Sequence, residues 1–459
     1  MDGRRVQELH SKSGLRHSGK YPDPEGSLGQ GSIYFTHVRD SLPVTLSKGN
    51  IETPKALQEV QVSDPHLDDV VQNLPPSENR RFYPALDGLR AVAVLMVFCQ
   101  HYFARPAGLR WGWTGVDVFF VLSGFLITGI LYDTRNSQHR FRNFYVRRTL
   151  RIFPLYYAIL LAAVLLMPIL HWVYHPIWYL WPLYLENYGR FIWVHDLQTN
   201  PYALDHLLSA TRHFANPPLV FYLGHFWSLC VEEQFYLAWP LVVFLVKDRV
   251  RLRNLCAAAF FVVLAARVLC VFAVPQNLLE AGLLERFTPF RVDSLLLGGF
   301  VALCLRGPES ARLTRFARPI MWAVAGAFLA MEGYYVVSTG SPYNPGVWVP
   351  WLGTIGYSMI DLFAAGLILQ AIQPETGVYR ILEYRWLRRL GQISYGFYVF
   401  HDIPHILYIK LVRHLFGANA THFSLRVAAL ALVGTLLMAY SSFRFFEAPF
   451  LKLKDRFTA

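Results

Sequence analysis

The sequence predicts an all-α fold, a polytopic integral membrane protein built as a bundle of about ten transmembrane helices behind a hydrophilic N-terminal tail. Hydrophobic residues make up 54% of the 459 residues and charged residues only 16%, well below the roughly 25% of an average soluble domain. The apolar residues form blocks near the roughly 20 residues that a membrane-spanning helix needs. Aromatic residues reach 15%, with 12 Trp and 25 Tyr, which gather at membrane interfaces.

The expected spans begin after Pro84 and continue almost to the C-terminus. Between the third and fourth spans, the stretch 172–225 is rich in Trp and Tyr. We interpret it as an external loop with an interfacial or re-entrant helix, and two short spans are the alternative. The spans are 86–104, 113–132, 153–171, 226–246, 255–274, 290–305, 319–338, 350–371, 391–411 and 424–444.

Basic residues fall in every second connection, which predicts the topology. Such connections stay on the cytosolic side of a membrane, so both termini are expected there. The expected division is a disordered hydrophilic cytosolic tail over 1–80, a transmembrane domain over 81–450 and a basic cytosolic C-terminus over 451–459. The basic clusters lie at 80–81, 140–151, 247–253, 306–318, 380–389 and 452–456.

The charge and the cysteines exclude other classes of protein. The net charge is +12, but the arginines lie in short connections, where they act as topology signals and contact anionic lipid rather than nucleic acid. The five cysteines fall in or beside apolar stretches without a CxxC pair, which indicates small buried side chains rather than disulfides or zinc ligands. We expect no bound metal and no bound cofactor.

Ionisable residues inside the spans are the first candidates for a site, because each costs at least roughly 2.5–3.5 kcal/mol to insert. Arg90 and His101 are eleven positions apart in the first span, so they share a helix face to within about 20° and lie about 16 Å apart along it. Arg90 suits the phosphates of a cytosolic donor, and His101 suits a general base. The alternative is that both side chains snorkel to the interfaces. Asp87 is placed to pair with Arg90.

Two further groups lie in or near the next spans. Asp117 is an acid inside the second span, and its partner is either His101 or an arginine. Arg148 and Arg151 are spaced i,i+3 in the following connection, and guanidinium groups bind phosphates in a bidentate manner. A topology signal is the alternative for these two arginines.

The later spans contribute secondary candidates. His225 and Glu232 are seven positions apart and share a helix face, with Glu233 adjacent, so either glutamate could orient a histidine or bind the acceptor. Other candidates are Arg291 and Asp293, for which a structural ion pair is the alternative, and His401. A metal pair of His401 with His405 is not expected, since Pro404 lies between them and no further ligand set is evident.

Six motifs together resemble the membrane-bound acyltransferase family 3. They are ALDGLRAVAVLMVFCQH, GWTGVDVFFVLSGFLI, FYVRRTLRIFPLYY, HFWSLCVEEQFYLAWP, RVDSLLLGG and LGQISYGFYVFHD. They follow the order of the family and cover about 83–450, nearly the whole expected membrane region.

The resemblance implies an O-acyltransferase that moves an acyl group, mostly acetyl, from acyl-CoA to a carbohydrate or lipid-linked glycan in a bacterial inner membrane. It implies that His101 is catalytic, with Arg90 in the same motif, and that Arg148 and Arg151 engage acyl-CoA. Glu232 matches the family's glutamate motif. Some members carry a fused extracytoplasmic domain, so a separate extracytoplasmic partner is a further expectation, beside contacts with membrane lipids.

The expected mechanism combines these residues. Arg148 and Arg151 hold the donor phosphates, and Arg90 guides the donor or supports developing charge. His101 either deprotonates the acceptor hydroxyl or carries the acyl group covalently, while Glu232 and Asp117 orient His101 or the acceptor. The alternative function is a transporter or flippase of a lipid-linked glycan, which would form no ester.

Overall fold

The computed structural model describes residues 83–103, 110–170, 179–189, 191–192, 223–340, 349–417, 425–454 and 456–457. These residues form helices, turns and connections, and no strand occurs among them. Seven helices in the described ranges are long and apolar enough to cross a membrane, which confirms a multi-pass, all-α membrane protein. They are Gly112–Asp133, Arg140–Leu166, Gly224–Leu245, Arg249–Ala273, Ser310–Thr339, Leu352–Ala371 and Leu425–Lys454.

Three other expected spans correspond to less regular helices. Helix α2 (Ala85–Phe103) carries several polar residues, and α11 (Val292–Cys304) has 13 residues. The span expected at 391–411 is divided into α16 (Ser394–Phe400) and α17 (His405–Phe416). The count of ten spans therefore stays a prediction. The tail over 1–80 and most of 172–225 lie outside the described residues.

The remaining helices complete the chain in order. They are α3 (Gly115–Asp133), α4 (Arg140–Leu170), α7 (Trp227–Leu245), α8 (Arg249–Ala273), the short α9 (Gln276–Glu280) and α10 (Leu283–Arg286), α12 (Ser310–Thr339), α13 (Tyr357–Ala371), α14 (Gly377–Leu382), α15 (Arg385–Gln392), α18 (Leu425–Ser441) and α19 (Ala448–Lys454). Single π-helical turns precede α13 at Leu352–Gly356 and α19 at Ser442–Glu447.

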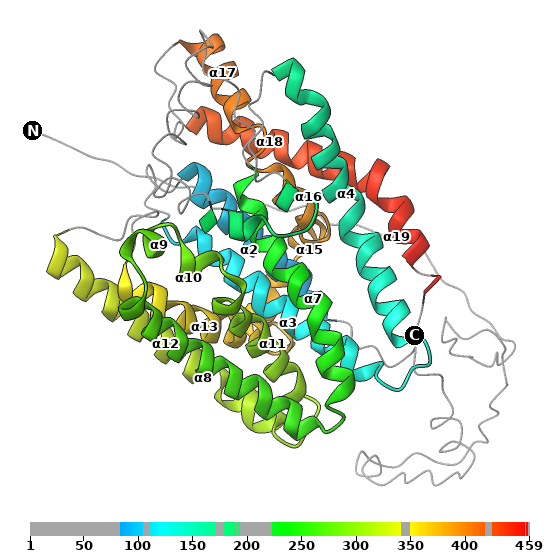
Figure 1. Cartoon of the computed structure of the whole chain (residues 1–459), viewed down its shortest axis with the longest axis vertical. Coiled ribbons are helices and arrows are strands. Elements are labelled where there is room, and N and C mark those ends of the chain that lie inside the picture. Colours follow the sequence, from blue (N-terminus) through cyan, green and yellow to red (C-terminus); the bar gives the residue numbers. More distant parts are fainter. Residues whose placement is uncertain are drawn as a thin grey trace, which may run out of the picture. The chain divides into compact units, whose positions relative to one another are not determined.

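Helix α3 is central to the described bundle and packs against α2, α7, α11 and α13 (Figure 1). Its contact with α11 is made by backbone against backbone. A Cβ atom on Gly124 would lie 1.8 Å from the carbonyl oxygen of Leu295, and one on Gly298 would lie 2.0 Å from that of Val121. Small residues permit such close approach between membrane helices.

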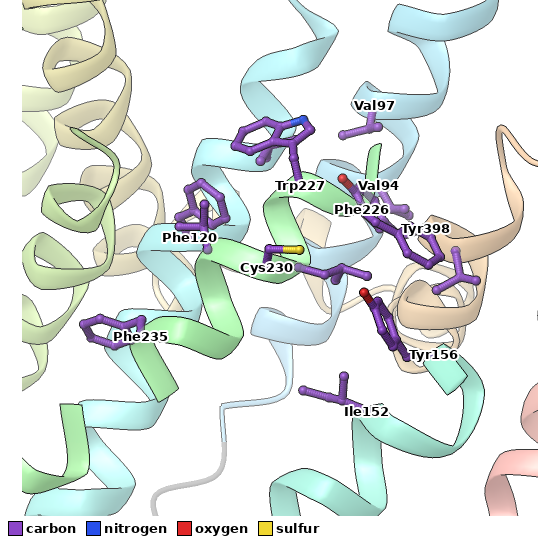
Figure 2. Packing of buried hydrophobic residues seen from close by; sticks show 14 of the residues in the cluster. Val94, Val97, Phe120, Ile152, Tyr156, Phe226, Trp227, Cys230, Phe235 and Tyr398 are labelled. Carbon is purple, nitrogen blue, oxygen red and sulfur yellow. The ribbon is translucent and has the colours of Figure 1, made fainter. Parts of the chain in front are cut away.

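An aromatic core fills the space between α3, α4, α16 and the start of α7. Figure 2 shows Phe120, Tyr156, Phe226 and Tyr398 converging from four different elements. These four side chains are at most 7% exposed, and the rings of Tyr156 and Phe226 lie 5.3 Å apart. Buried aromatic side chains contribute large apolar contact areas, so this core holds the four helices in the positions on which the site depends.

Ion pairs join the ends of four helices on one side of the bundle. Arg306, after α11, contacts Asp133 at the end of α3 at 2.5 Å, and Arg249, at the start of α8, contacts Glu309 before α12 at 2.9 Å. The hydrogen bond from Arg249 lowers the pKa of the Glu309 carboxyl. All these helix ends border connections expected to be cytosolic, so their grouping agrees with the alternation of basic charge.

The division between α16 and α17 differs from the single span expected there. Helix α16 ends at Phe400, the backbone N–H of His401 donates to Phe397 at 3.0 Å, and the next helix starts at His405. Pro404 has no N–H to donate, and its ring would clash with the carbonyl group four positions earlier in a continuous helix. The interruption lets the buried side chains of His401 and Asp402 contact neighbouring helices.

Candidate active site

A pocket among α2, α3, α4, α7 and α16 contains several of the predicted site residues. It encloses about 780 Å³ of empty space, part of which is open to the surroundings. The residues that line it are Arg90, Val116, Phe119, Phe120, Ser123, Leu126, Arg148, Arg151, Ile152, Ser228, Leu229, Glu232, Tyr236, Ser394, Tyr395 and Tyr398. The pocket therefore combines a cationic end with a long aromatic and apolar wall.

Three arginines from two helices form the cationic end. Arg90 comes from α2, and Arg148 and Arg151 lie one turn apart on α4. Arg90 pairs with Asp87 at 2.5 Å, as the i,i+3 spacing predicted. Among the described residues neither Arg148 nor Arg151 forms an ion pair. The Arg148 guanidinium lies 4.8 Å from the centre of the Tyr236 ring. Two guanidinium groups without carboxylate partners favour an anionic ligand in this pocket.

Glu232 is the acidic residue of the pocket. It lies on α7 and accepts a hydrogen bond from the Ser123 hydroxyl of α3. The charges of Arg148 and Arg90 act on this carboxylate. Glu232 therefore lies among the arginines, and it balances part of their charge while leaving the pocket cationic.

Ser228 and Tyr398 line the end of the pocket that contacts His225. The Tyr398 hydroxyl donates to the carbonyl oxygen of His225 at 2.8 Å and accepts from the Ser228 hydroxyl at 2.6 Å, and the Ser228 oxygen lies 3.2 Å from the same carbonyl oxygen. The ring of Tyr398 is 5.4 Å from that of His401. This end of the pocket thus borders a group of histidines.

Three histidine rings lie in contact beyond Tyr398. The ring of His401 is 4.8 Å from that of His101 and 4.9 Å from that of His225. His401 Nδ1 donates to the Tyr398 carbonyl at 2.6 Å, and His225 Nε2 donates to the Val399 carbonyl at 3.1 Å. A ring nitrogen that faces a carbonyl oxygen must carry a proton, so the backbone fixes the orientation of both rings.

His101 differs from the other two histidines of this group in two respects. Its side chain is 29% exposed, whereas His401 is 0% and His225 5% exposed. Its Nδ1 faces a carboxylate, Oδ1 of Asp402, at 3.5 Å. Of the three rings, His101 is the one that a substrate can reach and the one that is oriented by an acid.

Asp402 was not among the residues singled out from the sequence. It is separated by 301 positions from His101, so helical spacing could not reveal the contact. The available signal was an acid directly after a histidine and just before the helix-breaking Pro404. Tyr398 was missed as well, since an aromatic residue in an apolar span is ordinarily part of the core.

Asp117, Arg291 and Asp293 lie in a second group of charges. Asp117 pairs with Arg291, and Asp293 pairs with Arg267 at 2.6 Å. All four side chains are at most 1% exposed. The question left open for Asp117 is thereby answered in favour of an arginine, and the acid that faces His101 is Asp402.

Glu233 does not line the pocket, although its neighbour does. Its Oε1 is buried and makes no hydrogen bond to the described residues. Over the same described ranges, no three His, Cys, Asp or Glu side chains are arranged to hold a metal ion.

Comparison with known proteins gives a family match over most of the chain. The profile of an acyltransferase domain matches residues 83–443. No solved structure matches.

Three similar proteins are bacterial. The protein of Bacillus subtilis (strain 168) named "Putative peptidoglycan O-acetyltransferase YrhL" is 31% identical over 390 residues, which cover 81% of this chain and 55% of that protein. The peptidoglycan O-acetyltransferase OatA of Listeria monocytogenes is 29% identical over 382 residues, 82% of this chain and 56% of that protein. The O-acetyltransferase OatA of Staphylococcus aureus (strain NCTC 8325) is 29% identical over 377 residues, 81% and 58% respectively. The chain thus spans about half the length of these relatives.

Proposed function

Because the chain belongs to the acyltransferase family, we propose that it is a membrane-embedded O-acyltransferase that transfers an acyl group, acetyl first of all, from acyl-CoA to a hydroxyl of a carbohydrate acceptor. The observation that carries this proposal is the pocket itself. Its lining includes three arginines and Tyr398. His101 lies outside this lining, and His401 contacts both rings, at 5.4 Å from Tyr398 and 4.8 Å from His101.

The cationic end is suited to the phosphates of acyl-CoA. Arg148 and Arg151 are unpaired with acids among the described residues and lie one turn apart. Guanidinium groups bind phosphate oxygens through two parallel hydrogen bonds. Arg90, already paired with Asp87, contributes positive charge to the same pocket and guides the donor, while Glu232 limits the net charge.

The chemistry assigned to His101 is general-base catalysis. Its Nε2 takes the proton from the acceptor hydroxyl as the hydroxyl oxygen attacks the thioester carbonyl carbon. The carbon–sulfur bond then breaks, and the departing CoA thiolate receives the proton from the imidazolium. Donor and acceptor thus yield an ester and free CoA by direct transfer.

The names of the relatives suggest the class of acceptor. Two are called peptidoglycan O-acetyltransferases, so we propose a peptidoglycan-type glycan or its lipid-linked precursor. The alternating basic connections favour cytosolic termini, and with that topology the arginine end of α2 would face the cytosol, where acyl-CoA is available. A bacterial inner membrane fits this arrangement.

A transfer assay tests the proposal against the flippase alternative. Inverted membrane vesicles with and without the protein receive radiolabelled acetyl-CoA, and label is followed into alkali-labile esters of the glycan and lipid fractions. We expect esterified label only in vesicles that contain the protein. An absence of ester with acetyl-CoA and with longer acyl-CoAs, together with transbilayer movement of a lipid-linked glycan, would favour the flippase.

A further inference from the structure

We propose that Asp402 is a positioning residue for His101. Its Oδ1 lies 3.5 Å from His101 Nδ1, at the outer limit of a hydrogen bond, and a carboxylate there favours a proton on the nitrogen that faces it. His101 is then held in the tautomer whose Nε2 is free to take a proton from the acceptor hydroxyl. This inference rests on the function proposed above, and it assigns a role to an acid that ends the motif LGQISYGFYVFHD and does not line the pocket.

The interruption between α16 and α17 puts Asp402 in this place. Residue 402 lies between the last residue of α16 and Pro404, where the chain is not helical. Its side chain is 6% exposed, and a buried carboxylate requires hydrogen-bond donors to offset the loss of water. In a continuous helix the same residue would follow the helical rotation and could not be turned independently toward α2.

Two contacts fix this interruption against the end of α2. The hydroxyl of Tyr102 donates to the carbonyl oxygen of His401 at 2.8 Å, and the Tyr102 ring lies 4.8 Å from the ring of His405. His405 Nδ1 also lies 3.1 Å from the Asp402 Oδ1 atom. Asp402 is therefore held between two histidines, and Tyr102, the neighbour of His101, contacts both His401 and His405.

The other histidines near the site are not equivalent to His101. His401 and His225 donate to backbone carbonyl oxygens, so main-chain groups determine their orientation. His405 shares the acid with His101 but is 9% exposed, against 29% for His101. The ring that is both accessible and oriented by the carboxylate is that of His101, and this combination is typical of a base whose orientation is set by an acid.

The expected effect of removing the charge is large. Asparagine has nearly the shape of aspartate, but its amide either donates toward Nδ1 or accepts weakly, so the favoured tautomer is lost. Substitution of groups that orient a functional histidine lowers activity by roughly 10- to 100-fold in metal sites and by about 10⁴-fold in a serine-protease triad. We expect Asp402→Asn to lower kcat for acetyl transfer at least about 10-fold.

The test compares Asp402→Asn with Asp133→Asn. Asp133 is the partner of Arg306 and is 46% exposed, so the control makes the same chemical change away from the histidines. We expect Asp402→Asn to reduce kcat while the KM for acetyl-CoA stays within about twofold, and Asp402→Glu to recover part of kcat. A full kcat in Asp402→Asn, or a change confined to KM, would overturn the proposal.

A second measurement depends neither on activity nor on any variant of Asp402. Solid-state NMR of protein containing ¹⁵N-histidine, with His101→Gln used to assign the signal, reports the tautomer of His101 in the intact protein. We expect Nδ1 to carry the proton, and protonation on Nε2 alone would contradict the proposal.

The two proposals fail in different ways. Loss of activity in His101→Ala with full activity in Asp402→Asn would reject only the role of Asp402. Full activity in His101→Ala would reject His101 as the base.

Discussion

Replacing Arg148 with alanine tests the donor site directly. Arg148 lines the pocket from α4 and forms no ion pair among the described residues. Its removal breaks no ion pair, and Glu232 keeps the hydrogen bond from Ser123, so folding is expected to be preserved. If Arg148 binds a phosphate of acyl-CoA, its loss should weaken donor binding without changing the reaction at the thioester carbonyl.

The size of the effect follows from the type of contact. A hydrogen bond to a charged group contributes about 1.5–3 kcal/mol, and a tenfold change in affinity corresponds to about 1.4 kcal/mol. We therefore expect the KM for acetyl-CoA to rise about 10- to 100-fold in Arg148→Ala. The value of kcat at saturating donor should change by no more than about twofold, because the contact is present in the ground state and the transition state alike.

Arg147→Ala is the matched control for this experiment. It removes the same charge from the adjacent position, but Arg147 does not line the pocket and donates to the backbone carbonyl of Phe457 instead. Initial rates of ester formation are measured over a range of acetyl-CoA concentrations in vesicles with equal amounts of each variant. Equal KM values for Arg148→Ala and wild type, or equal increases in both variants, would refute the donor site described here.

Two further predictions concern stability and are measured by thermal unfolding in detergent. Gly124→Ala brings a Cβ to 1.8 Å from the Leu295 carbonyl oxygen and should destabilise the protein by about 1–3 kcal/mol. The control Gly326→Ala, where a Cβ would meet nothing within 4 Å, should not lower the unfolding temperature. Similar effects of both substitutions would contradict the α3–α11 contact. Asp117→Ala leaves the buried Arg291 without this partner and should cost about 3–5 kcal/mol, so an unchanged unfolding temperature would argue against a structural ion pair.

The arrangement of the helices was largely predictable because membrane spans are determined by local properties of the chain. Long apolar blocks and alternating basic connections correctly predicted a multi-pass helical protein. The i,i+3 spacing of Arg148 and Arg151 correctly placed both on one face of a helix, and both line the same pocket. What these side chains bind stays a prediction, since no ligand contact can be derived from spacing alone.

The contacts between distant segments were not predictable in the same way. The span expected over 391–411 was interpreted as one helix, although Pro404 divides it. That interruption brings Asp402 to His101, which no single-helix argument could reveal. The pairing of Asp117 was left open for the same reason: several basic residues were available, and only the packing of α3 against α11 selects Arg291.

The most direct test of the central claim is acetyl transfer by membranes that contain wild-type protein or His101→Ala in equal abundance. Both receive labelled acetyl-CoA, and the label that enters the glycan and lipid fractions as alkali-labile ester is measured. The account predicts label with the wild type and none above background with His101→Ala. Undiminished label in the variant would contradict His101 as the base and the assignment of this site.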